Sequence, residues 1–175
     1  MLKKARKGFT LIEMLVVVAM MVALIALIGF VGPSLTRPAK QSSWEGSMKN
    51  LQEALMVYSN QNGERYPAAP GNTAVDVTTW LKSSGVGNYL SKTIENPFYK
   101  GTTVGIIGSS GGSSAPANPS SSLKAVDDSS CASSSPSSIV PIVEYDTWKD
   151  SNGLEHFIIF WKIGSNTYSL SDGVR

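Results

Sequence analysis

Apolar residues are unevenly spread along the chain, and the longest run lies near the N-terminus. Residues 14–31 form an apolar run of eighteen residues without a charge. At a rise of 1.5 Å per residue, about 20 apolar residues match the ~30 Å core of a bilayer. The run predicts a membrane-spanning helix over residues 9–33. A conventional cleaved secretory signal is the alternative, but its apolar core is usually shorter and is followed by small residues.

A second apolar pattern predicts that the helix continues over residues 34–62. Its apolar positions are separated by 4, 3, 4 and 3 residues, which at about 100° per residue gives a narrow stripe. The stripe consists of Trp44, Met48, Leu51, Leu55 and Tyr58. Asn62 and Gly63 form a helix stop signal. We expect this stripe to cover the protein's own sheet; another protein is the alternative partner.

Residues 139–175 show a third pattern, in which β-branched and aromatic runs alternate with turn signals. The runs are residues 139–147, 154–163 and 166–170. The middle run is apolar on both faces, so we expect both faces to be covered. The pattern predicts an antiparallel sheet of three or four strands packed on the outer half of the long helix. The fold class is therefore α+β.

Two segments of different composition connect the helix to these strands. Residues 63–108 are expected to be a mixed helical and loop region, with a helical turn from Trp80 and a strand over residues 102–107. Residues 109–138 contain fourteen Ser among thirty residues. Such a segment buries too little apolar surface to offset the entropy of ordering, which predicts a flexible insertion. Cys131 lies within it, either as a free thiol or, less expectedly, in an intersubunit disulfide.

The charge of the chain is concentrated at its N-terminus. Lys3, Lys4, Arg6 and Lys7 are four of the fifteen basic residues, and without them eleven basic residues face thirteen acidic ones. This balance is too mild to indicate a nucleic-acid partner. Cations before an apolar span predict a cytoplasmic N-terminus. A single Cys excludes an intramolecular disulfide and any zinc site made of several Cys.

Few residues suggest catalysis or metal binding. His156 is the only His, and the Ser residues are concentrated in the insertion, so no Ser-His-Asp arrangement is expected and the chain is not predicted to be an enzyme. Asp146, Asp150 and Asn152 are oxygen-rich and close in sequence. Calcium prefers six to eight oxygen ligands, so these three residues form a candidate calcium site, with an ordinary acidic turn as the alternative. No other cofactor is expected.

Glu13 is the one acid at the start of the apolar span. A carboxylate in such a position costs free energy and usually has a partner. The string KGFTLIE at residues 7–13 resembles the cleavage and methylation motif of type IV prepilins and pseudopilins. A Glu13 side chain that reaches the membrane surface by itself is the alternative to a paired one.

The resemblance implies a defined course of processing. Residues 1–8 would be a leader peptide that a prepilin peptidase removes by cutting between Gly8 and Phe9, and the new Phe9 amine would be methylated. Glu13 would then pair with the Phe9 ammonium of a neighbouring subunit. Opposite charges attract strongly at low dielectric, and pairing offsets the desolvation of both.

Further strings extend the resemblance toward major pseudopilins and imply a pilin-like fold. They are residues 50–58, Tyr66-Pro67 and Asn96-Pro97-Phe98. The implied partners are the peptidase, other subunits in a homo-oligomeric helical filament, an inner-membrane assembly platform and membrane lipid. The implied location is the bacterial inner membrane for a single-pass precursor, and then the cell envelope or a surface filament.

The resemblance leaves several functions open. The chain is expected to be a structural subunit of a type IV pilus-like filament, or alternatively a pseudopilin of a type II protein secretion system. Many type IV pilins have a C-terminal disulfide loop, which a chain with one Cys lacks. An envelope protein that binds a ligand through its outer domain, and a signal-anchored enzyme, are further alternatives. Both of these predict an N-terminus without prepilin processing.

Overall fold

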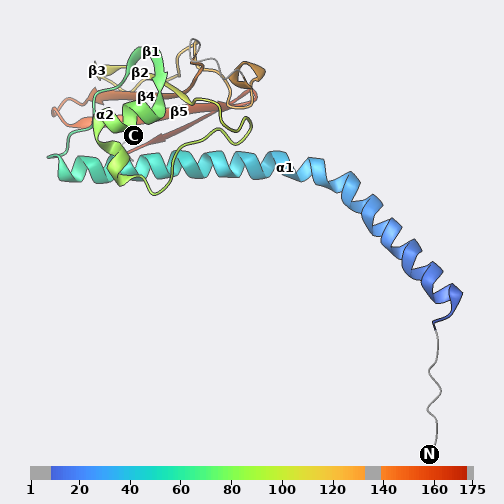
Figure 1. The fold of residues 1–175 in the computed structure, drawn as a ribbon. Helices are drawn as coiled ribbons and strands as arrows, with labels where there is room; N and C mark the ends of the chain where they lie inside the picture. Colours follow the sequence, from blue (N-terminus) through green and yellow to red (C-terminus); the bar gives the residue numbers. More distant parts are fainter. Residues whose placement is uncertain (1–8, 133–138, 173–175) are drawn as a thin grey trace, which may run out of the picture. The chain divides into compact units, whose positions relative to one another are not determined.

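The computed structural model describes residues 9–132 and 139–172, and of residues 27–35 the backbone only. The expected leader, residues 1–8, lies outside this range. The chain divides into two compact units, Met1–Ala39 and Lys40–Arg175. Helix α1 (Leu11–Gln61) contributes residues to both units, which confirms the predicted long N-terminal helix (Figure 1).

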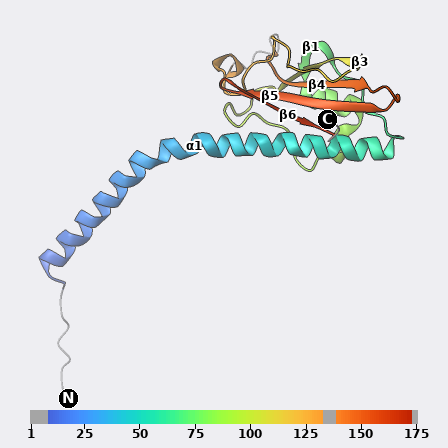
Figure 2. The same cartoon turned by 180° about the vertical axis from the view of Figure 1, so that it is seen from behind.

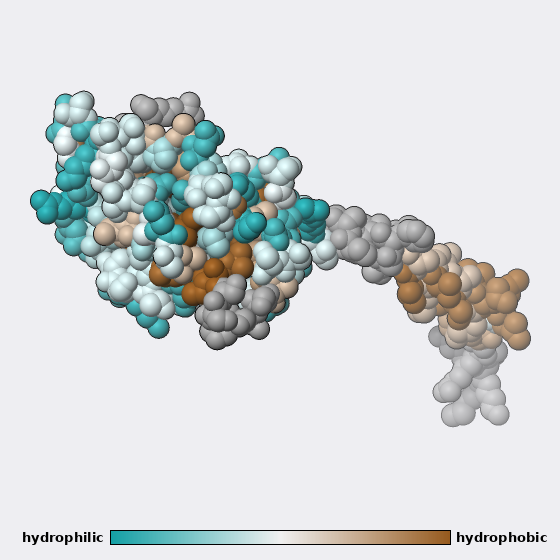
Figure 3. Space-filling model, turned by 90° about the horizontal axis from the view of Figure 1, so that it is seen from above, coloured by the Kyte–Doolittle hydropathy of each residue, from teal (hydrophilic) through white to brown (hydrophobic). Residues whose placement is uncertain are grey.

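The part of α1 in the first unit exposes its apolar side chains. All thirteen large apolar side chains of residues 9–25 are between 41% and 85% exposed. They appear as a brown segment in Figure 3. Among the described residues, no helix has the length and hydropathy needed to cross a bilayer, so they do not support the predicted membrane-spanning first half.

The second unit contains a six-stranded sheet whose path runs β1-β2-β4-β5-β6, with β3 also paired to β4. Figures 1 and 2 show the sheet from its two sides. The last three strands correspond to the three runs predicted from the sequence. The strands are β1 (Gly71–Asp76), β2 (Gly105–Gly108), β3 (Ser110–Gly112), β4 (Pro141–Lys149), β5 (Glu155–Ile163) and β6 (Asn166–Ser171).

The sheet is mixed, and the prediction of a wholly antiparallel sheet is wrong. Strands β4, β5 and β6 are antiparallel to one another, as is the pair β1 and β2. Strands β2 and β3, however, both run parallel to β4. A parallel pair requires a crossover connection of a dozen or more residues, and the Ser-rich segment between β2 and β4 provides it. The turn signals of the sequence identified only the two hairpins.

Among the described residues, three short helices lie in the connections between the strands, and each contributes buried side chains to the core. They are α2 (Val77–Ser84), η1 (Val86–Tyr89) and η2 (Ser129–Ala132). Asp76 caps α2 by accepting a hydrogen bond from the Thr78 amide, and Gly85 ends it with a left-handed φ of 82°. A non-Gly residue is disfavoured in that conformation.

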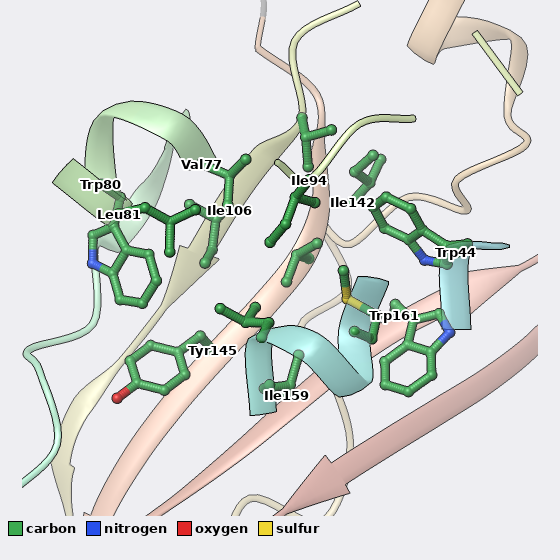
Figure 4. Close-up of a cluster of buried hydrophobic side chains, with 14 of the residues drawn as sticks. Trp44, Val77, Trp80, Leu81, Ile94, Ile106, Ile142, Tyr145, Ile159 and Trp161 are labelled. Atoms are coloured by element: carbon green, nitrogen blue, oxygen red, sulfur yellow. The ribbon is translucent and has the colours of Figure 1, made fainter. Parts of the chain in front are cut away.

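The hydrophobic stripe of α1 forms the centre of the core, which confirms that it covers the protein's own sheet. Trp44, Met48, Leu51 and Leu55 are fully buried and belong to one cluster with strand residues. Figure 4 shows Trp44 beside Trp161 of β5. Farther along, the Gln52 amide donates to the Ser171 carbonyl at 2.5 Å, which fixes α1 to the edge strand β6.

The Ser-rich segment differs from the expected flexible insertion over its described part, residues 109–132. Leu123, Val126 and Cys131 are buried, and the Val126 amide donates to the Lys162 carbonyl at 2.9 Å. These few apolar side chains, together with backbone hydrogen bonds, attach a segment whose Ser content alone suggested no ordered structure. Residues 133–138 of the expected insertion lie outside the described residues.

Two glycines let β2 approach β4 closely. A Cβ atom at Gly105 would lie 2.2 Å from the Val140 carbonyl oxygen, and one at Gly108 would lie 1.7 Å from that of Tyr145. Both neighbours are backbone atoms, which cannot turn away as a flexible side chain can. Glycine is therefore required at both positions for this parallel pairing.

We predict that Gly108→Ala destabilises the protein by about 3 kcal/mol or more, because the added methyl group overlaps the β4 backbone. Gly46→Ala is the matched control, since no atom lies within 4 Å of its Cβ position and alanine favours the helix. Thermal unfolding of the detergent-solubilised chain measures both changes. Equal melting temperatures for the two variants would contradict this account of β2.

Candidate functional site

The start of α1 is closed by a reciprocal pair of hydrogen bonds between Thr10 and Glu13. Oε2 of Glu13 accepts from the Thr10 amide and from its hydroxyl, both at 2.8 Å. The Thr10 Oγ1 in turn accepts from the Glu13 amide at 3.3 Å. This arrangement is a capping box, and it satisfies amide groups that a helix N-terminus otherwise leaves unpaired.

The capping box fixes the position of the Glu13 carboxylate. The negative charge lies in the first turn of α1, where the helix dipole favours an anion. Only Oε2 is engaged, and Oε1 accepts no hydrogen bond from the described residues. Phe9 lies just before the cap and is 74% exposed. Among the described residues, Oε1 of Glu13 therefore has no donor, and Gly8 lies outside the described residues.

The sequence contains the signal for this cap, which the analysis of the pattern missed. A Thr followed three residues later by Glu before an apolar run is the sequence form of a capping box. The resemblance implies only that the Glu13 carboxylate pairs with the Phe9 ammonium of a neighbouring subunit. The structure adds a local role, because Glu13 also stabilises the first turn of its own helix.

Of the three residues of the candidate calcium site, Asp150 and Asn152 lie together in the hairpin turn, and Asp146 lies apart from them. Asp146 lies within β4 and accepts from the Ser109 amide and hydroxyl, at 2.6 and 2.8 Å. Asp150 lies in the hairpin turn, where Oδ1 accepts from the amides of Asn152 and Leu154. At about 3.3 Å per strand residue, four residues separate Asp146 from Asp150 by roughly 13 Å. Across the described parts of the chain, no three His, Cys, Asp or Glu side chains converge as a metal site.

A pair of buried carboxylates, which the sequence analysis did not identify, lies on β4. Glu144 and Asp146 are 6% and 3% exposed. They are two residues apart on one strand and therefore point to the same face of the sheet. Ser120 of the Ser-rich segment donates its amide to Glu144 at 2.7 Å, as Ser109 does to Asp146. Two acids at alternate positions of an apolar strand were the available signal.

Glu144 binds its proton more tightly in the folded protein than an ordinary glutamic acid does. Burial raises the pKa of Glu144 to about 7, and the charge of Asp146 and a hydrogen bond to it add to the effect. The Ser120 amide and the Lys162 ammonium oppose the shift because both favour the ionised form. The hydrogen bonds from Ser120 to Glu144 and from Ser109 to Asp146 attach the Ser-rich segment to the sheet.

Cys131 is a free, buried thiol. Its Sγ donates to the Ala125 carbonyl oxygen at 3.4 Å. Burial raises its pKa to about 11, and the nearby charge of Asp128 contributes. A thiol that is protonated and covered is a poor nucleophile, so the geometry favours a structural role over a reactive one or an intersubunit disulfide.

His156 lies on β5 between two aspartates. Its Nδ1 is 2.8 Å from Asp172 Oδ2, and its Nε2 is 3.5 Å from Asp150 Oδ2. The ring also lies 5.5 Å from that of Trp148, between ring centroids. No Ser, Thr or Cys side chain is among these contacts, so they do not form a nucleophilic triad.

Comparison with known proteins adds one finding. Residues 3–29 match a family model described as the prokaryotic N-terminal methylation motif. The match covers the expected cleavage bond, Phe9, the capping box and Glu13. No curated protein and no solved structure is significantly similar to the chain.

We predict that the stability of the protein falls as the pH rises from 4.5 to 7. Over this window the folded state keeps a proton on Glu144 that the unfolded state, with its ordinary pKa of 4.5, has released. Glu144→Gln removes this contribution and keeps an acceptor for Ser120. Thermal unfolding at several pH values, with Glu53→Gln as an exposed control, measures the difference. Parallel pH profiles for the native and Glu144→Gln proteins would show that Glu144 does not titrate in this range.

Proposed function

We propose that this chain, which carries the prepilin-type signature of type IV pilins and pseudopilins at residues 3–29, is a structural subunit of a type IV pilus-like filament. The observation that carries the proposal is the match over these residues. It includes the bond to be cleaved, the amine that cleavage would create and the acid that would receive it. In this proposal the chain acts by assembly, and we assign it no catalytic role.

Processing supplies the positive charge that Glu13 lacks. A prepilin peptidase cuts between Gly8 and Phe9 and methylates the new amine, which remains a cation at neutral pH. The basic leader keeps that end of the precursor in the cytoplasm until it is removed. Before cleavage the Phe9 nitrogen is an amide and cannot neutralise a carboxylate.

Assembly then pairs the Phe9 ammonium of one subunit with Glu13 of another. The free Oε1 of Glu13 supports this step, because the capping box can persist while a second donor binds. Removing one partner of a buried ion pair costs about 3–5 kcal/mol of stability, because the other charge is left buried and unpaired. A subunit that enters out of register leaves both charges unpaired among apolar side chains, so the pair selects the register.

The apolar surface of α1 provides the remaining driving force. A single copy leaves thirteen large apolar side chains of residues 9–25 exposed. Packing such helices side by side removes this surface from water, and each buried side chain contributes about 1.5–3 kcal/mol. Membrane lipid covers the same surface before assembly.

The proposed function implies a location and a set of partners for the chain. The precursor resides in the bacterial inner membrane with its N-terminus in the cytoplasm. The processed subunit moves through an inner-membrane assembly platform into a homo-oligomeric filament of the envelope or surface. The unit Lys40–Arg175 contains the whole hydrophobic core, which supports its role as the filament's outer domain.

A pseudopilin of a type II secretion system is the second candidate. The resemblance of Tyr66-Pro67 and Asn96-Pro97-Phe98 to strings of major pseudopilins supports it, and residues of both strings make contacts within the domain. Tyr66 contacts Phe157 edge to face at 4.7 Å between ring centroids. Asn96 accepts from the Phe98 amide and donates to the Val126 carbonyl. Surface filaments seen by electron microscopy would favour the pilus, whereas loss of protein secretion in a deletion strain would favour the pseudopilin.

We predict that Gly8→Val prevents removal of the leader, because a branched side chain beside the scissile bond obstructs the peptidase. Mass spectrometry of the protein from cells should then find Met1 retained. Ala5→Val is the control, since it enlarges a leader residue away from the bond and should leave cleavage at Phe9 intact. A native chain that itself retains Met1 would refute the processing and favour an envelope protein that binds a ligand.

We predict that Glu13→Gln abolishes or strongly reduces filaments while leaving the precursor in the membrane. Glutamine can replace glutamate in a capping box, so this variant removes the charge and keeps the cap. Thr10→Ala removes the cap and keeps the charge, and should cost about 1 kcal/mol of helix stability with a smaller effect on assembly. Glu53→Gln controls for loss of an exposed charge elsewhere on α1. Normal filament yield from Glu13→Gln, measured by shearing and electron microscopy, would refute charge pairing.

A further inference from the structure

The surroundings of His156 differ from those of an ordinary buried histidine. The residue is 5% exposed, and it lies on β5, which pairs with β4 on one side and β6 on the other. Asp172, which follows β6, holds one ring nitrogen at 2.8 Å. The other ring nitrogen, Nε2, is buried and has no hydrogen-bond partner. A buried polar atom without a partner costs free energy and calls for an explanation.

The contact with Asp172 determines what Nε2 can do. A carboxylate accepts a hydrogen bond, so the neutral imidazole carries its hydrogen on Nδ1. Nε2 then presents a lone pair. A carboxylate behind one ring nitrogen is the usual way in which proteins orient a metal-binding imidazole and increase its basicity.

A second oxygen ligand faces this lone pair. The Oδ1 atom of Asp150 accepts hydrogen bonds from the amides of Asn152 and Leu154 at 2.8 and 2.9 Å. These bonds fix the carboxylate in the turn. Its Oδ2 lies 3.5 Å from Nε2 of His156. With its hydrogen on Nδ1, the imidazole presents Nε2 as an acceptor to Oδ2, and a cation between these two atoms, either a proton or a metal ion, stabilises the contact. The Asp150 side chain is 27% exposed, so an ion can enter from the solvent.

We propose that Asp150 and His156 bind a divalent transition-metal ion such as Zn²⁺, with Asp172 as the positioning residue for the imidazole. Zinc binds His nitrogen and Asp oxygen at about 2.0–2.2 Å in a tetrahedral arrangement, which places two neighbouring ligand atoms about 3.3–3.5 Å apart. The observed separation of 3.5 Å between Nε2 and Oδ2 fits that edge. Imidazole and carboxylate together favour zinc or nickel over calcium, which prefers oxygen ligands alone.

Water completes the coordination, because the site has two protein ligands. Asn152 provides a third group nearby, since its amide nitrogen lies 3.4 Å from Asp150 Oδ2 and a flip of the amide would present the oxygen instead. Glu155 is occupied elsewhere: one oxygen pairs with Lys149 and the other accepts from the Tyr66 amide. The ion would tie the β4–β5 hairpin turn to strand β5, and through Asp172 to the end of β6.

The single His makes the test direct. In the detergent-solubilised full chain, ¹⁵N-labelled histidine gives one pair of imidazole signals. The signal of Nε2 reports directly on binding at that nitrogen, because Nδ1 is held by Asp172. Zn²⁺ should shift the Nε2 signal and raise the melting temperature of the protein. A chelator should reverse both effects.

Three variants separate metal binding from a general effect on folding. Asp150→Asn should abolish the Zn²⁺-dependent shift, and Asp172→Asn should weaken Zn²⁺ binding about 10–100-fold and redistribute the two tautomers. Asp128→Asn is the matched control, because Asp128 also accepts from an amide two residues ahead, that of Ser130. It should leave Zn²⁺ binding unchanged. The proposal is overturned by an Nε2 signal that ignores millimolar Zn²⁺, by an unchanged response in Asp150→Asn, or by an imidazole protonated on both nitrogens and insensitive to Zn²⁺.

Discussion

An unpaired carboxylate among apolar side chains is the constraint on which the account of this protein depends. Glu13 is the only charged residue of residues 9–25, where all large apolar side chains are exposed in a single copy. The capping box satisfies part of its hydrogen-bonding capacity but does not neutralise its charge. An environment that covers the apolar surface therefore leaves this charge at a cost in free energy, unless it also supplies a cation or lets the carboxylate reach water. Cleavage after Gly8 would create such a cation at Phe9, four residues before Glu13. In the proposed filament, the Phe9 ammonium of one copy neutralises Glu13 of another, so the unpaired charge favours assembly.

The same helix serves two kinds of packing along its length. From Trp44 onward its apolar positions form a narrow stripe, of which Trp44, Met48, Leu51 and Leu55 are fully buried in the core of the second unit. In residues 9–25 the apolar positions follow one another without a polar face, and their large apolar side chains are exposed. A narrow stripe suits a partner on one side, whereas an apolar surface all round suits lipid or a bundle of helices. The change in pattern therefore distinguishes the part of α1 that packs on the sheet from the part whose apolar side chains are exposed.

Periodicity and turn residues predicted much of the fold, and long-range pairing accounts for what they missed. The stripe that includes Trp44 and Leu51 identified the helix and its buried face, and the turns around Gly153 and Gly164 identified the hairpins β4–β5 and β5–β6. The parallel pairing of β2 with β4 depends on a crossover through a segment whose composition suggested disorder, and local patterns carry no information about such a contact. Glu144 and Asp146 were overlooked for a related reason, since their significance arises from Ser109 and Ser120, which are distant in sequence. At the candidate site, the motif located Glu13, but only the structure showed that Thr10 already binds it.

The central claim concerns a contact between two copies, so filaments made from two differently labelled populations test it most directly. One population would carry ¹⁵N in the Phe9 amine and the other ¹³C in the Glu13 carboxyl group, and solid-state NMR would measure transfer between the two labels. The account predicts transfer in the mixed filaments, which places the ammonium of one subunit within a few ångströms of the carboxylate of another. Assembled filaments without such transfer, or with transfer only when both labels are in the same chain, would contradict it.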